Sequence, residues 1–256
     1  MGTIKVTPLG QVGYRFEYKG CVIYIDPYLS NSVEDKEGGG HLRRFPIAIE
    51  PIDIDDADWV LITHEHLDHC DPITLSAISK ASKNCRFMAP PPAQLMLHTA
   101  GVSKNRVSSS AENIATALSR AVSVISVPAA HPAISRDIDG YLSCVGYVLN
   151  FDGKLVYHAG DTSVHPELIE KLREFRRLDY GFIPVNEFNY FRMESGIIGN
   201  MTVREAFLFA ERVNVLTMVP THWDMFAPNS AEREEIELLY RAYKPHFKLV
   251  FYPTSL

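Results

Sequence analysis

The sequence contains no apolar run close to the roughly 20 residues that a membrane-spanning helix requires. It also contains no linker, no low-complexity tract and no strong internal repeat, so we expect a single domain over residues 1–256. Residues 1–6 lead straight into strand-like alternation, and we therefore expect no secretion signal. Neither the composition nor these absences suggest a membrane partner.

Cysteine is scarce, and the cysteines show no Cys-x-x-Cys spacing. Scattered thiols in a chain of this length are typical of a reducing compartment, so we expect a cytoplasmic protein without a disulfide framework. An excess of positive charge is also lacking, because the net charge is −6. This balance argues against a general nucleic-acid surface, and no nucleic-acid partner is expected. The four cysteines are Cys21, Cys70, Cys85 and Cys144.

Histidine and aspartate, in contrast, are concentrated in residues 63–69, which read Thr-His-Glu-His-Leu-Asp-His. This segment follows the apolar run 59–62, which is typical of a buried strand. It precedes Asp71 and Pro72, a pair typical of the start of a helix. The sequence therefore predicts a loop that connects the end of a strand to the start of a helix.

The spacing within this loop favours metal binding. Side chains two apart in an extended turn share a face, so His64 and His66 point the same way. Asp68 and His69 follow round the turn and can face a second point nearby. Imidazole and carboxylate are ligands of catalytic zinc, manganese and iron. The loop thus predicts the beginning of a two-metal site, with a solvated histidine-rich loop as the alternative.

Further ligand-type residues follow other predicted strands. His131 follows an alternating apolar stretch at 122–128, Asp161 follows a strand at 154–157, and His222 follows an apolar run at 216–220. Function often concentrates at such strand ends. Each residue taken alone would more often be ordinary, but together with the loop they suggest one site.

At these positions the sequence resembles the metallo-β-lactamase superfamily, whose signature is a His-x-His-x-Asp-His loop followed by a histidine, a bridging aspartate and a last histidine. The similarity extends to a subgroup similar to L-ascorbate-6-phosphate lactonase. The chain departs from that subgroup near Glu187, where relatives often carry a glycine and a basic pair. The segments that carry the subgroup resemblance are 24–30, 68–72, 158–162, 199–206 and 220–226.

The resemblance implies an α/β fold, a four-layer αββα sandwich of mixed β-sheets with helices outside. It also implies two divalent ions, either zinc or manganese. One ion would be held by His64, His66 and His131, the other by Asp68, His69 and His222, and Asp161 would bridge both. Two such ions about 3.5–4 Å apart can share a hydroxide and polarise a substrate oxygen.

The expected activity is therefore metal-dependent hydrolysis of a small anionic lactone or ester, such as a sugar-phosphate lactone. A phosphodiesterase or nuclease and a thioester hydrolase of the same superfamily are the alternatives, and a scaffold that has lost its metals is disfavoured because no ligand position is missing. The expected partners are a small-molecule substrate and further copies of the chain in a homo-oligomer.

Other candidates surround this core. Asp68 could pass a proton to the leaving group, and His158 could donate a proton or lie buried under the sheets. Asp26 and Asp58 are candidates for holding a ligating histidine. Cys70 is either a soft ligand or a small buried residue. The candidates for substrate binding are Arg43, Arg44, Asn186, Arg192 and Trp223.

The remaining chain alternates between strand and helix signals. Residues 31–50 form a long loop expected to close over the site. Residues 112–127 are compatible with helix or strand, and the resemblance favours strands. Strands are predicted at 4–9, 14–18, 22–25, 59–62, 86–88, 144–151, 154–158, 180–185 and 247–251. Helices are predicted at 73–82, 92–100, 166–177, 202–213 and 229–243.

Overall fold

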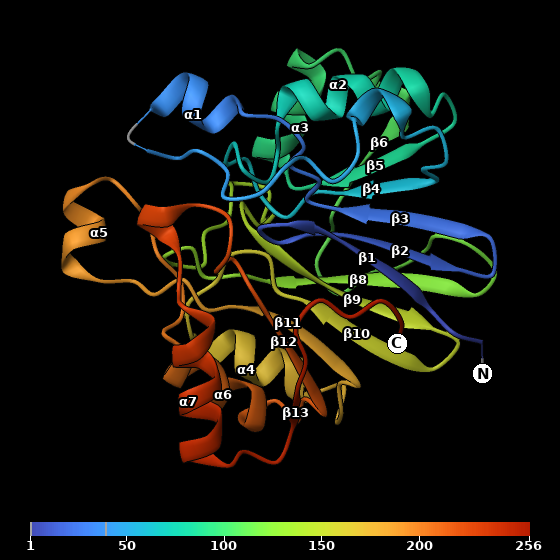
Figure 1. The fold of residues 1–256 in the computed structure, drawn as a ribbon. Coiled ribbons are helices and arrows are strands. Elements are labelled where there is room, and N and C mark those ends of the chain that lie inside the picture. Colours follow the sequence, from blue (N-terminus) through green and yellow to red (C-terminus); the bar gives the residue numbers. More distant parts are fainter. Residues whose placement is uncertain (1, 39) are drawn as a thin grey trace.

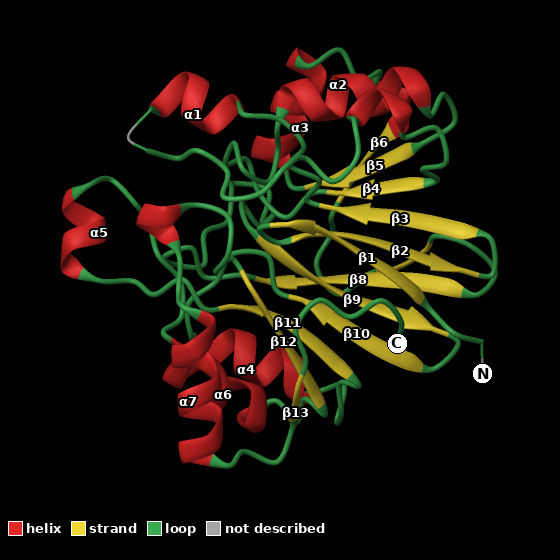
Figure 2. Ribbon diagram, in the orientation of Figure 1, coloured by secondary structure: helices red, strands yellow, loops and turns green. Residues whose placement is uncertain are grey.

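Two β-sheets pack face to face, and helices cover the outer side of each sheet (Figure 1; Figure 2). The computed structural model describes residues 2–38 and 40–256. The first sheet, in spatial order, comprises β1 Lys5–Gly10, β2 Gly13–Tyr18, β3 Cys21–Ile25, β4 Trp59–Leu61, β5 Arg86–Ala89 and β6 Val107–Ser109. The second comprises β13 Lys248–Leu249, β12 Thr217–Thr221, β11 Tyr180–Pro184, β10 Lys154–His158, β9 Val145–Phe151, β8 Val122–Pro128 and β7 Ala115–Ala117. The expected αββα sandwich is confirmed.

Each sheet is half antiparallel and half parallel. Strands β1 to β3 and strands β7 to β10 are antiparallel, whereas β3 to β6 and β10 to β13 are parallel. Tight turns join the antiparallel strands at Lys19-Gly20 and Asp152-Gly153, where both residues of each pair have positive φ. This backbone matches the twist of a two-residue hairpin, which is the role predicted for both pairs.

The helices lie in the crossovers between parallel strands. Helices α2 and α3 cover the first sheet, and α4, α6 and α7 cover the second (Figure 1). Short 3-10 helices occur at Pro51–Asp53, Lys104–Arg106 and Ala227–Asn229. The α-helices are α1 Ser32–Glu37, α2 Pro72–Ala81, α3 Pro91–Thr99, α4 Pro166–Arg173, α5 Tyr190–Glu194, α6 Val203–Arg212 and α7 Arg233–Tyr243.

Aromatic side chains fill the space between the sheets. Phe16 lies edge-on to Phe182 with ring centroids 5.5 Å apart, and Tyr18 packs likewise on Phe151 at 5.7 Å. Outside this core, Leu75 and Ile78 of α2 are fully buried against the first sheet. Burial of such side chains is the main source of stability in a layered fold.

Several segment predictions differ from the structure in extent. Residues 112–127 contain strands β7 and β8, as the resemblance favoured. The loop at 31–50 includes the short helix α1 before Gly39, which lies outside the described residues. The helix predicted from residue 229 begins only at Arg233, because a 3-10 turn containing Pro228 precedes it. Helix α5 was not predicted; the Asn189 side chain initiates it by accepting a hydrogen bond from the Arg192 amide.

The loops that follow β3, β4, β8, β10 and β12 meet at one edge of the sandwich. Helices α1 and α5 project from this edge, while the two ends of the chain lie at the opposite side (Figure 1). Across residues 2–38 and 40–256, none of the helices combines the length and the apolar character needed to cross a bilayer. The loops at this edge are the expected position of a functional site, because binding and catalytic residues often lie on loops held by a rigid scaffold.

Candidate metal centre

The histidine-rich loop is clamped between a sheet and a helix, as predicted. Strand β4 ends at Leu61, and the Asp71 carboxylate caps α2 by accepting hydrogen bonds from the amides of Ile73 and Thr74. The opposite sheet also holds the loop, because the Val145 amide donates to the Thr63 carbonyl at 3.0 Å. These contacts fix the backbone from which the loop's side chains project.

Three other loops deliver their side chains to the same point. The loops that carry His131 and Asp161 are joined by the Ala130 amide, which donates to Thr162 Oγ1 at 2.9 Å. Gly160 has a φ of +59°, and a Cβ placed there would lie 2.7 Å from the Thr63 side chain, so only glycine fits the turn before Asp161. His222 follows β12 and also has positive φ, with its amide bonded to the Gln11 carbonyl at 3.0 Å.

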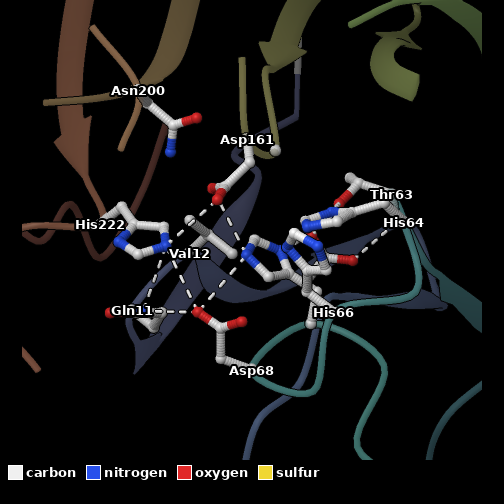
Figure 3. A network of polar contacts seen from close by, with 12 residues as sticks. Gln11, Val12, Thr63, His64, His66, Asp68, Asp161, Asn200 and His222 are labelled. Atoms are coloured by element: carbon white, nitrogen blue, oxygen red, sulfur yellow. Dashed lines mark hydrogen bonds and ion pairs between the residues drawn. The ribbon is translucent and has the colours of Figure 1, made fainter. Parts of the chain in front are cut away.

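All seven predicted ligand residues meet there (Figure 3). Their ligand atoms form three groups, within each of which all atoms lie within 4.8 Å of one another. The groups are His64, His66 and His131; Asp68, His69 and His222; and His64, His69 and Asp161. The first two are the sets expected for two separate ions.

Asp161 lies between the two sets, in the position expected of a bridging carboxylate. Its Oδ2 is 3.6 Å from His131 Nε2 and 3.3 Å from His222 Nε2. Its Oδ1 is 3.4 Å from His69 Nε2. One buried carboxylate thus faces a histidine of the first set and two histidines of the second.

Asp26 holds His69 from behind, as expected of a residue that orients a ligand. His69 Nδ1 donates to Asp26 Oδ2 at 2.8 Å, and both groups are fully buried. Thr63 adds two hydrogen bonds to the same carboxylate, from its amide at 2.8 Å and from its hydroxyl at 2.5 Å. This arrangement fixes the tautomer of His69 and leaves Nε2 facing Asp68 and Asp161.

The charges of the cluster divide the histidines into two kinds. Burial opposes protonation of His222, but Asp161 and Asp68 outweigh it and raise its pKa to about 9. Burial likewise opposes a proton on His69, yet Asp161 and Asp68 raise its pKa well above the usual value. Burial lowers the pKa of His131 to about 4 and that of His64 well below the usual value. Protonated and neutral imidazoles therefore coexist around two carboxylates.

The buried polar atoms fit a cation. Within the described chain, His64 Nε2, His69 Nε2 and Asp161 Oδ1 are buried and have no hydrogen-bond partner. A buried polar atom without a partner costs about 1–3 kcal/mol, so a fold rarely retains several in one place without a compensating group. Neutral imidazole nitrogens and carboxylate oxygens are the donors that zinc and manganese accept. A divalent ion would satisfy these atoms, and its binding would release protons from His69 and His222.

A cavity of about 560 Å³ opens onto the cluster, within the usual size range of small-molecule sites. Helix α1, the segment after α5 and the turn after β12 supply its other walls. It is lined by Val33, His41, His66, Leu67, Asp68, Asp161, Ser195, Gly196, Ile197, Ile198, His222, Phe226, Pro228 and Asn229. Four of these residues belong to the metal-type cluster, so the cavity leads directly to it.

The family model described as the beta-lactamase superfamily domain matches residues 22–223, which contain all seven clustered residues. The chain belongs to the beta-lactamase superfamily. Among curated proteins it is 26% identical to a metal-dependent hydrolase of Pyrococcus furiosus over 237 residues, which cover 92% of each chain. It is also 26% identical to a probable L-ascorbate-6-phosphate lactonase of Salmonella heidelberg over 226 residues, covering 83% of this chain and 62% of the relative. Among solved structures, a metallo hydrolase of Ignicoccus hospitalis has the same fold, with a TM-score of 0.72, 20% identity and coverage of 100% and 98%.

Two residues that we expected to assist this beta-lactamase-superfamily site lie elsewhere. Asp58 precedes β4, whereas the metal loop follows it, so Asp58 lies at the opposite edge of the sheet and is exposed. Its carboxylate accepts a hydrogen bond from the Val22 amide at 2.8 Å. His158 is buried, with Nε2 2.7 Å from the Val12 carbonyl and Nδ1 accepting from the Gly160 amide at 3.3 Å. Both ring nitrogens are therefore engaged, and His158 is a core residue, the second of its two predicted roles.

The three arginines expected to bind an anion are engaged in structural contacts. Arg43 donates to the Tyr28 carbonyl at 2.9 Å and stacks on the Tyr28 ring, 5.3 Å from its centroid. Arg44 is exposed and pairs with Glu232 at 3.4 Å. Arg192 donates to the carbonyls of Asn186, Glu187 and Ser230. None of them lines the cavity, so the structure does not bring them to the site.

The other two residues predicted to contact the substrate do not line the cavity either. Asn186 is fully buried and bonds the side chains of Asn200 and Asn229, so it lies behind the cavity wall that Asn229 forms. Trp223 donates to the Pro220 carbonyl at 3.1 Å and packs on Phe251 at 5.4 Å.

Cys70 was expected to be either a soft metal ligand or a small buried residue, and the structure favours the second alternative. It is fully buried, and its thiol points to the Ala93 carbonyl at 3.8 Å. It belongs to none of the metal-type groups found among the described residues.

Sequence reasoning missed two residues of the site. Gln11 lies in the β1–β2 turn with a positive φ, and its Nε2 is 2.8 Å from Asp68 Oδ2 and 3.2 Å from His222 Nε2 (Figure 3). His41 lines the cavity, and its Nδ1 is 2.6 Å from the Gly38 carbonyl. The only sequence signal for Gln11 was its position between two glycines of a turn, and His41 offered none beyond its residue type.

Proposed function

We propose that the protein is a metal-dependent hydrolase that holds two divalent ions, zinc or manganese, and cleaves a lactone or ester. The observation that carries the proposal is the meeting of five histidines and two aspartates, from both sheets, at the base of a cavity of about 560 Å³. The names of the hydrolase and lactonase relatives support the reaction class.

In this proposal His64, His66 and His131 hold one ion, Asp68, His69 and His222 hold the other, and Asp161 serves both. Two ions held by such ligands would lower the pKa of a bound water molecule and would polarise the carbonyl oxygen of the substrate. The chain itself has two purposes here, to fix the positions of those ligands and to shield them from water. His64, His69, Asp161 and His222 are buried and the side chain of His131 is 1% exposed, which serves the second purpose.

The positioning residues act through the ligands. Asp26 and Thr63 hold the ring of His69, and Gln11 holds one carboxylate oxygen of Asp68. Among the described residues, Oδ1 of Asp68 makes no hydrogen bond, and the side chain is 18% exposed where it lines the cavity. Burial opposes a negative charge on Asp68, but His69 and His222 outweigh it and lower its pKa. Asp68 is thus an ionised group at the cavity surface, and in this proposal it would carry a proton to the leaving group.

The wider setting is part of the proposal. Free thiols at all four cysteines support a cytoplasmic location. A small-molecule substrate is supported by the cavity size, and a homo-oligomer would be tested by analytical ultracentrifugation.

The decisive experiment combines metal analysis with one substitution. Purified protein should contain close to two transition-metal ions per chain, and a hydrolysis screen should identify a lactone or ester substrate. Asp161→Ala should lose metal and activity, because one carboxylate serves both ligand sets, while the exposed control Asp55→Ala should keep both. Absence of metal from the wild-type protein, or full metal retention by Asp161→Ala, would contradict the proposal. Turnover only of phosphodiesters or thioesters would replace the proposed substrate with one of the two alternatives.

A further inference from the structure

The cavity offers few positively charged groups. Among the described residues that line it, His41 is the only one besides the four metal-type residues that can carry a charge. Within residues 2–38 and 40–256, no lysine or arginine lines it. The arginines nearest in sequence to its walls donate to backbone carbonyls or pair with a surface glutamate. A phosphate or carboxylate at the far end of a substrate would therefore lose water without gaining a charged partner, which is costly.

Part of the cavity wall is formed by apolar side chains that pack against one another. Phe226 is buried, with its ring edge-on to Tyr28 at 5.9 Å and to His41 at 5.7 Å. Val33 of α1 belongs to the same packed group, which Leu67 of the metal loop adjoins. A preformed apolar wall favours an apolar ligand because neither partner must reorganise or be ordered on binding.

Exposed apolar side chains continue from the cavity along the segment that contains helix α5. Ile197 and Ile198 line the cavity directly after α5, and Ile198 is 40% exposed. Helix α5 stands away from the sandwich on long loops (Figure 2) and carries the exposed side chains of Phe191 and Met193, the former 76% exposed. Apolar side chains grouped beside a ligand cavity commonly mark a binding surface.

We propose that the substrate of this site is an uncharged lactone or ester bearing an apolar chain, which lies against Leu67, Ile197 and Ile198. The inference rests on the proposed hydrolase function and replaces the anionic substrate expected from the sequence. The reacting carbonyl would lie at the histidine and aspartate cluster, and the chain would extend toward the segment after α5.

The test uses metal-loaded wild-type protein and γ-lactones with unbranched side chains from none to six carbons, with 6-phosphogluconolactone as the anionic probe. Each buried methylene should raise kcat/KM about threefold to fourfold until the wall is covered. The phosphorylated lactone should be the poorer substrate. A higher kcat/KM for the phosphorylated lactone, or no dependence on chain length, would overturn the inference.

Binding of the matching γ-lactams, which resist hydrolysis, separates this inference from the proposed reaction. If lactam affinity rises with chain length while no lactone is cleaved, the hydrolase proposal fails and the substrate class stands. If lactones are cleaved but lactam affinity does not depend on chain length, the hydrolase proposal stands and the proposed substrate class fails.

A pair of variants locates the wall. Ile198→Ser should weaken binding of the longest lactam about fivefold and leave the shortest unchanged. The matched control Leu238→Ser, on the exposed face of α7, should change neither. Equal effects of both variants, or an equal loss for long and short lactams in Ile198→Ser, would count against the proposed position of the chain.

Discussion

Replacing Asp26 by asparagine tests how the second set of ligands is held. The carboxylate accepts three hydrogen bonds, from His69 Nδ1 at 2.8 Å and from the Thr63 amide and hydroxyl at 2.8 and 2.5 Å. An asparagine of the same shape keeps one acceptor oxygen, which can satisfy the Thr63 amide. Its NH2 group, however, would face the N–H of His69, so one charge-assisted hydrogen bond is lost and two donors oppose each other.

The magnitude follows from those contacts. Loss of a buried hydrogen bond to a charged group costs about 1.5–3 kcal/mol, and we expect the free energy of unfolding of the metal-free variant to fall by about that amount. Metal affinity should fall about 10- to 100-fold, as is usual when the partner of a ligating histidine is removed. The loss should concern the ion held by His69, while the ion held by His64, His66 and His131 is retained more firmly.

The assay is a competition titration with a chromophoric chelator, together with urea unfolding of the metal-free protein. Asp55→Asn, an exposed change on the same side of the molecule as the first sheet's loops, serves as the control. Wild-type affinity for both ions in Asp26→Asn would refute the positioning role of Asp26. Failure of the wild-type protein to bind any ion would instead refute the metal centre itself.

Two further predictions concern protonation. In the metal-free protein, the folded state keeps a proton on His222 up to a pKa of about 9 against 6.5 when unfolded, so its contribution to stability is lost as the pH rises from 6.5 to 9. The pKa of His131 is lowered to about 4, so the folded state loses stability as the pH falls from 6.5 to 4. Urea unfolding at several pH values should therefore show the largest contribution of these two histidines to stability near pH 6.5. Burial raises the pKa of the Cys85 thiol to about 12 and excludes reagents from it, so it should react with a thiol reagent at pH 8 only after unfolding. Rapid labelling of Cys85 in the native protein, or stability of the metal-free protein that rises steadily from pH 6.5 to 9, would contradict the respective assignment.

The parts of the site that were predictable from sequence are those fixed by local backbone geometry. The loop after β4 carries four of its ligand-type residues within six positions, and the helix cap at Asp71 fixes where that loop ends. His131, Asp161 and His222 each follow a strand of the second sheet, and parallel alignment of β8, β10 and β12 brings those strand ends to one edge. Their assignment to the two ligand sets came from the resemblance, because separations of dozens of residues carry no local signal.

The expectation that Asp58 as well as Asp26 holds a ligating histidine shows the limit of such reasoning. Both are aspartates next to a short apolar strand, but Asp58 directly precedes β4 and Asp26 directly follows β3. Because β3 and β4 are parallel, only the residue after the strand reaches the edge where the metal loop lies. The direction of neighbouring strands, which a single sequence does not show, decided between the two.

The arginines expected to bind the substrate lie outside the cavity lining for a different reason. An arginine in a long loop can bind a ligand anion or satisfy backbone carbonyls that the loop leaves without partners, and sequence does not distinguish these uses. Arg43 and Arg192 serve the second purpose: their guanidinium groups hold irregular segments at Tyr28 and at Asn186 to Ser230. Each such contact holds a guanidinium group outside the lining of the cavity, which includes apolar residues such as Phe226. The same irregular loops that made an anionic substrate plausible in the sequence therefore engage these two arginines in structural contacts in the folded chain.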